Sequence, residues 1–300
     1  MRFNMRQFIL FLGLFFFLNT TIIATENQKK EILFKPGFGV VTYAEYLPFK
    51  DKPIKIYYYI PEDGKIQNMP VLLAMHGGAR DAKELMEAMA TEAKEKKVMV
   101  FAPEFTLKLY SVSEYQEVGL VTDNQVLRKE SDWTVKVVDQ IFEFIIAHSA
   151  SKAKKYDIYG HSAGGQFVHR FMLIHNSPYA NRAMVGSPGW YTFPDTTMVY
   201  PYGIKNTPFA NKKTIREFLS KQIILHLGTK DTIRESFLRA TPEAEKQGKN
   251  RYERGEIFYL YLQNLASTNK WKFNWTKVET PDVPHDSKLM GKIGLNYVYK

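Results

Sequence analysis

Short apolar runs alternate along the chain with longer segments in which apolar positions recur every three or four residues. Continuous apolar runs are typical of strands buried on both faces of a parallel sheet, and the longer spacing is typical of amphipathic helices. This order predicts an α/β protein with a mostly parallel central sheet of about eight strands and helices on both faces. The expected strands cover residues 38–47, 54–60, 71–76, 98–102, 156–159, 183–186, 222–227 and 271–278.

The helical pattern is clearest where an acidic residue precedes an apolar stripe. Asp81 and Asp132 occupy such positions and are expected to act as N-caps. Residues 105–129 lack periodicity and predict a long loop, and no repeat or linker divides residues 25–300, which we expect to form a single domain. The expected helices cover residues 81–97, 132–149, 164–176, 232–247 and 256–268.

The N-terminus has the layout of a secretory signal peptide. Arg2 and Arg6 form a positive segment, and residues 8–18 follow as an apolar run of 11 residues. That run is shorter than the roughly 20 residues that span a bilayer. We therefore predict a signal peptide over residues 1–24, cleaved after Ala24, a secreted or periplasmic protein, and no stable membrane span after cleavage. The alternative is an uncleaved N-terminal anchor over residues 8–24.

Composition excludes several kinds of chemistry. The chain contains no cysteine, which rules out disulfides, thiolate nucleophiles and thiolate zinc sites. Its formal net charge is +10, but the basic residues are spread out and no nucleic-acid-binding motif accompanies them, so we expect no nucleic-acid partner. Four arginines interleave with glutamates and are expected on solvated helical faces: Arg234, Arg239, Arg251 and Arg254.

Residues 160–164 read G-H-S-A-G, the pattern of a nucleophile elbow. The match follows an apolar strand and opens a helix, which is the context that the elbow requires. Gly160 and Gly164 allow the strand and helix backbones to approach closely, so that the Ser162 hydroxyl projects from the sheet edge. Ser162 is therefore the candidate nucleophile. The alternative is a glycine-rich turn in which Ser162 caps the helix.

A serine nucleophile needs a base, and in this arrangement an acidic residue and then a histidine follow it along the chain. Of seven histidines, His285 alone follows the last expected strand. Asp231 ends the loop after strand 222–227, where a carboxylate could orient the imidazole. The alternatives are a surface histidine and an aspartate that caps a helix from residue 232. The rival carboxylates are Asp195, Asp282 and Asp286.

Two backbone amides are expected to stabilise the oxyanion of an acyl-transfer reaction. One belongs to Ala163, directly after the candidate nucleophile. The other should come from the loop after the third strand, which reads H-G-G-A-R over residues 76–80. Gly78 and Ala79 are both candidates, and a simple tight turn is the alternative interpretation.

With these motifs in this order, the chain resembles the α/β-hydrolase superfamily, and in particular secreted bacterial esterases of the polyhydroxybutyrate depolymerase and feruloyl esterase group. The resemblance implies attack by serine, an acyl-enzyme intermediate, and no metal or organic cofactor. Members of that group often use cysteines and appended domains. This chain has no cysteine and shows no appended domain, which favours a carboxylesterase over a depolymerase.

The segment over residues 188–211 is aromatic and proline-rich, and excursions at this place in the fold often line the active site. Trp190, Tyr191 and Phe193 are candidates for contact with a small-molecule or polymeric ester, and ordinary packing over the core is the alternative. Weaker candidates in the long loop are Phe105, Tyr110 and Tyr115.

Two other functions fit the same motifs. A serine peptidase of the prolyl-oligopeptidase type has the same triad order but usually carries a gating domain, for which this chain is too short. A non-catalytic binding protein of the same fold usually lacks a triad member, whereas all three candidates are present here.

Overall fold

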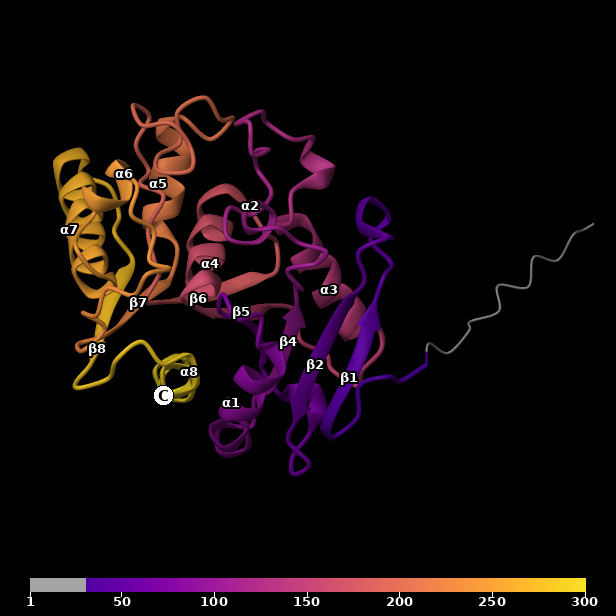
Figure 1. Cartoon of the computed structure of the whole chain (residues 1–300). Coiled ribbons are helices and arrows are strands. Elements are labelled where there is room, and N and C mark those ends of the chain that lie inside the picture. Colours follow the sequence, from indigo (N-terminus) through magenta and orange to yellow (C-terminus); the bar gives the residue numbers. More distant parts are fainter. Residues whose placement is uncertain (1–30) are drawn as a thin grey trace, which may run out of the picture. The chain divides into compact units, whose positions relative to one another are not determined.

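The chain is built around an eight-stranded sheet, seen in a computed structural model that describes residues 31–300 (Figure 1). The predicted signal peptide, residues 1–24, lies outside the described residues. The strands are β1 (Gly37–Tyr43), β2 (Ile54–Ile60), β3 (Val71–Met75), β4 (Met99–Glu104), β5 (Tyr156–His161), β6 (Ala180–Gly186), β7 (Ile223–Gly228) and β8 (Trp275–Thr280).

The strand order is β1-β2-β4-β3-β5-β6-β7-β8. β2 pairs antiparallel with β1 and β4, and all other neighbours are parallel. The mostly parallel sheet of about eight strands is confirmed. Because the parallel strands all point the same way, the loops after β3, β5, β7 and β8 meet at one sheet edge.

Helices cover both faces of the sheet. Leu72 and Ala74 of β3 point to the face packed by α1 and α8, and Leu73 and Met75 point to the opposite face, packed by α3, α4, α5 and α7. Figure 1 shows α1 and α8 on the lower side of the sheet. The helices are α1 (Ala82–Lys96), α2 (Val112–Tyr115), α3 (Val135–Ala147), α4 (Ala163–Ile174), α5 (Lys212–Ser220), α6 (Pro242–Glu245), α7 (Arg251–Asn269) and α8 (Ser287–Val298), with 3-10 turns at Leu47–Phe49, Ile66–Asn68 and Glu130–Asp132.

The predicted helix over residues 232–247 is wrong. Only α6 is helical there, because Thr241 caps a new turn that begins at Pro242. α7 begins at Arg251 rather than 256, since the Asn250 side chain accepts a hydrogen bond from the Glu253 amide. α5 and α8 were not predicted, although polar caps precede both: Asn211 for α5 and Asp286 for α8.

The two predicted aspartate caps also differ from the structure. Asp81 occupies the N-cap position of α1 but makes no capping hydrogen bond. Asp132 lies in the 3-10 turn before α3, whose N-cap position is held by Thr134. Within residues 31–300, no helix combines the length and apolar character needed to cross a membrane.

Candidate active site

Ser162 lies at the turn between β5 and α4, at the sheet edge where the parallel strands end. Its backbone has φ 56°, in a region that L-residues rarely adopt. Ser162 occupies the N-cap position of α4, but its side chain makes no capping hydrogen bond. The cap interpretation therefore fails, and the hydroxyl is left free to face the pocket.

Three glycines around Ser162 are required by close backbone packing. A Cβ at Gly160 would lie 2.3 Å from the Gly164 carbonyl oxygen, and one at Gly164 would lie 2.1 Å from the Met75 carbonyl oxygen. At Gly165 the distance to the Gly186 carbonyl oxygen would be 2.5 Å. A side chain at any of these positions would push β5, β3, α4 or β6 apart.

The imidazole of His285 lies between Ser162 and Asp231. Nδ1 of His285 is 2.7 Å from Oδ2 of Asp231, and Nε2 is 3.0 Å from Oγ of Ser162. An ionised carboxylate can only accept, so Nδ1 carries the proton and Nε2 is left to accept the serine proton. The structure brings these three predicted residues together, although Asp231 and Ser162 precede His285 by 54 and 123 positions in the sequence.

The rival aspartates have other partners. Asp286 caps α8 by accepting hydrogen bonds from the Lys288 and Leu289 amides. Asp195 accepts from the Thr197 amide at 2.7 Å, and Asp282 lies 3.7 Å from the exposed Lys230 ammonium.

Asp231 lies beside a buried cation that the sequence reasoning placed on the surface. The side chain of Arg251 is 2% exposed, and its Nη1 lies 3.7 Å from Oδ1 of Asp231. The same nitrogen also pairs with Glu235. Arg254 is fully buried as well, where it donates to the Gly189 carbonyl oxygen at 2.7 Å. The prediction of solvated arginines is wrong at both positions, since α7 begins earlier and turns its first residues inward.

The loop over residues 77–79 faces Ser162. A Cβ at Gly77 would lie 4.0 Å from Cβ of Ser162, and Gly77, Gly78 and Ala79 all line the pocket. Within residues 31–300, the amides of Gly78 and Ala79 donate no hydrogen bond to a backbone carbonyl. The structure thus brings all three predicted oxyanion-hole residues to the pocket.

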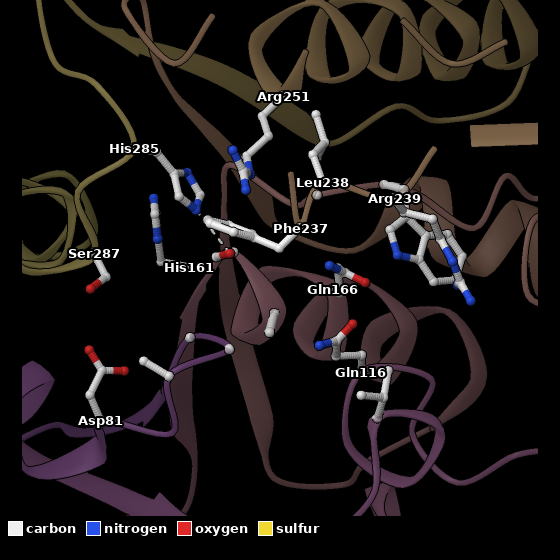
Figure 2. A pocket seen from close by; sticks show the side chains of 18 residues that line it. Asp81, Gln116, His161, Gln166, Phe237, Leu238, Arg239, Arg251, His285 and Ser287 are labelled. Carbon is white, nitrogen blue, oxygen red and sulfur yellow. Dashed lines mark hydrogen bonds between the residues drawn. The ribbon is translucent and has the colours of Figure 1, made fainter. Parts of the chain in front are cut away.

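The pocket above Ser162 has a volume of about 680 Å³ (Figure 2). Of the predicted substrate contacts, Trp190 lines it. Tyr191 and Phe193 instead pack against Phe258, at ring-centroid distances of 4.3 and 5.1 Å. The three weaker candidates are core residues with 0–1% exposure: Phe105, Tyr110 and Tyr115.

The polar and cationic side chains on the pocket wall were not predicted from the sequence. Arg239 lines the pocket, pairs with Glu117 at 2.9 Å, and stacks on Trp190 with its Cζ 4.3 Å from the ring centroid. Gln166 is buried, and its Oε1 has no hydrogen-bond partner within the described residues. Figure 2 shows Gln166 and Gln116 facing one another beside Arg239. No local sequence pattern marks these side chains, because they come from separate elements.

Three groups near Ser162 have donor atoms within 4.8 Å of one another: His161, Asp231 and His285. Burial, with the nearby His285 and Arg251, holds the pKa of His161 well below its usual range, so this imidazole is neutral. Two imidazoles and a carboxylate are possible metal ligands. However, the Arg251 cation beside Asp231 disfavours a second positive charge there.

No family profile matches the chain, and no curated protein matches it either. Poly(aspartic acid) hydrolase-1 from Sphingomonas sp. KT-1 is 33% identical, with a TM-score of 0.84, covering 89% of this chain and 100% of that chain. A poly(3-hydroxybutyrate) depolymerase, LpqC from Bordetella parapertussis, is 25% identical, with a TM-score of 0.83 and coverage of 88% and 90%. FphF, a fluorophosphonate-binding serine hydrolase from Staphylococcus aureus, is 16% identical at a TM-score of 0.59 over 89% and 100%, and shares the fold.

Proposed function

Because this chain belongs to the α/β-hydrolase superfamily of serine hydrolases, we propose that it cleaves carboxylic esters through an acyl-enzyme on Ser162. His285 acts as general base and acid, and Asp231 orients it. One observation carries the proposal: a continuous hydrogen-bond chain joins Ser162 and His285, which line the pocket, to the buried Asp231, with distances of 3.0 and 2.7 Å.

In the first half-reaction, Oγ of Ser162 attacks the ester carbonyl carbon while its proton moves to Nε2 of His285. Collapse of the tetrahedral intermediate breaks the bond to the leaving oxygen, which takes that proton and departs as the alcohol. Water then repeats the sequence on the acyl-enzyme and releases the acid. Asp231 stabilises the imidazolium in each step without taking the proton.

The oxyanion of each intermediate is stabilised by backbone amides. We assign one donor to Ala163, at the start of α4, where the helix dipole also favours negative charge. The second donor is Gly78 or Ala79. Each such donor is worth roughly 10²–10³ in rate.

The pocket wall carries a partly exposed cation, Arg239, which pairs with Glu117 and stacks on the Trp190 ring. Arg251 also lines the pocket, but Asp231 and Glu235 already balance its charge. The Arg239 cation supports a second candidate function, the hydrolysis of an acidic polymer, in line with the name of the 33%-identical relative, a poly(aspartic acid) hydrolase. Polymeric or small-molecule esters remain the first candidate.

We also propose that the protein is exported, on the strength of the signal pattern over residues 1–24. Expression of the full chain in a bacterial host with periplasmic fractionation tests this. N-terminal sequencing that begins after Ala24 supports cleavage, and a full-length chain in the membrane fraction supports the anchor instead.

The catalytic proposal is tested with a fluorophosphonate probe and a substrate panel. The wild type should be labelled on Ser162 and should hydrolyse short p-nitrophenyl esters, whereas S162A should do neither. A panel of esters, proline-containing peptides, poly(aspartic acid) and poly(3-hydroxybutyrate) ranks the esterase, peptidase and depolymerase functions. A wild type that takes no label and turns over no substrate would point to the non-catalytic binding protein.

A further inference from the structure

The loop that carries the second oxyanion donor ends at a strained residue. Arg80 has φ 63°, a left-handed conformation that residues with a side chain seldom adopt, and its amide donates to the Gly77 carbonyl oxygen at 3.2 Å. Non-glycine residues persist in this conformation when surrounding contacts hold them there.

The Arg80 side chain turns away from the pocket and into the long segment that follows β4. Its Nη1 donates to the Phe105 carbonyl oxygen at 2.7 Å, and its Nη2 donates to the Tyr110 carbonyl oxygen at 3.2 Å. Its Cζ lies 4.5 Å from the ring centroid of Tyr115. Arg80 is not among the residues that line the pocket. It therefore acts on the loop rather than on a substrate.

The other end of the loop is held by His76. Its Nε2 accepts a hydrogen bond from the Phe105 amide at 3.0 Å, so the ring proton lies on Nδ1, which donates to the Gly77 carbonyl oxygen at 2.9 Å. Burial lowers the pKa of His76 to about 3, which keeps the ring neutral and this tautomer in place. Both ends of the loop are thus tied to the segment after β4.

Tyr115 joins these contacts to the nucleophile elbow. Its hydroxyl donates to the His76 carbonyl oxygen at 2.7 Å, and its ring stacks on His76 at 4.5 Å. The ring also stacks on Phe167 of α4 at 5.3 Å. The side chain of Tyr115 is fully buried. The same tyrosine therefore touches the loop and the helix that supply the two proposed oxyanion amides.

We propose that Arg80 is a positioning residue, which with Tyr115 holds the amides of residues 77–79 at a fixed distance from Ser162. The inference rests on the proposed function, since it needs an oxyanion at this place. It gives the segment after β4 a role in catalysis without contact with the substrate. Because a preorganised donor acts mainly in the transition state, loss of the clamp should lower kcat more than it raises KM.

The test compares R80G, R80K and Y115F with the wild type. Glycine adopts a positive φ readily, so R80G keeps the turn and removes only the clamp. We expect R80G to lower kcat by about 10²-fold with KM changed less than about threefold. R80K, which can make one of the two hydrogen bonds, should recover part of kcat. Y115F should fall between R80K and the wild type.

A trifluoromethyl ketone inhibitor forms an oxyanion on the enzyme. Its affinity therefore distinguishes a loss of oxyanion stabilisation from a loss of protein stability. Its affinity should fall with kcat/KM across the series, while the affinity of the matching methyl ketone stays constant. R182M is the control, because Arg182, like Arg80, is partly buried and donates to a backbone carbonyl, that of Val298; unlike Arg80, it also pairs with a carboxylate, that of Asp157. R182M should leave kcat and both inhibitor affinities unchanged.

An R80G variant that keeps kcat and ketone affinity while Ser162 is still labelled would overturn the positioning role alone. Equal losses of kcat and ketone affinity in R80G and R182M would also overturn the positioning role, because such losses would reflect general destabilisation of the protein. A wild type that neither reacts with fluorophosphonate nor turns over any substrate would overturn the proposed function, and the Arg80 inference with it.

Discussion

Two regions of the molecule meet at the pocket and are held by different forces. The elbow region, residues 160–165, is held by backbone contact: Cβ atoms at Gly160, Gly164 or Gly165 would lie 2.1–2.5 Å from carbonyl oxygens. The charged region, residues 228–251 and 281–286, is held by ion pairs. Within it, Arg251 lies between the carboxylates of Asp231 and Glu235. The geometry around Ser162, the proposed nucleophile, thus depends on the absence of side chains, and that around Asp231 and His285, the proposed acid–base pair, depends on charged ones.

Because of this difference, the two regions should respond differently to amino-acid substitutions. Close backbone contacts are short-range and leave no room for any added atom. Buried ion pairs leave room, but removal of one partner strands the other charge in a poorly solvated place. A substitution in the elbow region should therefore act through volume, and one in the charged region through charge.

The largest expected effect is in the charged region. R251M keeps most of the side-chain volume but leaves Asp231 and Glu235 without their shared cation, so we expect unfolding free energy to fall by about 3–5 kcal/mol and kcat to fall as well. R251M/E235L should recover part of the stability, because an apolar pair replaces an ionic one. Urea unfolding measures both, with R216M, an exposed arginine on α5, as the control. Equal stability of R251M and R216M would contradict the importance of charge here.

The next effect is in the elbow region. G164A adds one methyl group where the nearest atom is a backbone oxygen, and should cost about 1–3 kcal/mol or more. G78A is the matched control, since a Cβ there meets nothing within 4 Å. Thermal unfolding of both variants tests the comparison. If G78A and G164A are equally destabilised, close packing is not what holds this region.

The smallest effect concerns pH, and it comes from two buried histidines close to these regions. Burial lowers the pKa of His76 to about 3 and that of His226 on β7 to about 4, from a usual value of 6.5. Each imidazole takes up a proton on unfolding, so stability is intact above pH 6.5 and is lost as the pH falls toward 4. We expect the free energy of unfolding to fall by roughly 1 kcal/mol per histidine between pH 7.5 and pH 6.

Unfolding free energies at several pH values measure this slope. H226N should reduce the dependence of the unfolding free energy on pH by the contribution of one histidine, whatever its effect on stability at a single pH. An unchanged slope in H226N would show that His226 takes up no proton on unfolding.

The elbow region could be predicted from sequence because its determinants are local. Gly160, Ser162 and Gly164 lie within five residues, between a strand and a helix that their own apolar patterns reveal. Asp231 and His285 were found because strand order brings both loops to the same edge as Ser162. A parallel sheet places the carboxyl ends of its strands at one edge, where such a contact can form.

The charged region was predicted poorly because its partners are distant in sequence. Alternating Arg and Glu residues over 232–247 have helical propensity, yet the segment is mostly irregular, because several of its charges pair with α6 and α7 rather than with water. Arg251 was expected in solvent and is instead 2% exposed. The Asn250–Glu253 cap was the one local signal that could have placed α7 correctly.

The sequence alone determined the succession of strands along the chain, the elbow and the candidate triad, since each depends on local periodicity, glycine spacing or chain order. Only the tertiary structure decided which charges are buried, which aromatic residues face the pocket, and that Arg80 and Tyr115 link the loop over residues 76–80 to the segment after β4. Those outcomes depend on side chains that come within hydrogen-bonding or stacking distance although they lie 16 or more positions apart in the sequence. Burial and charge pairing are properties of that assembled environment, and no local pattern encodes them.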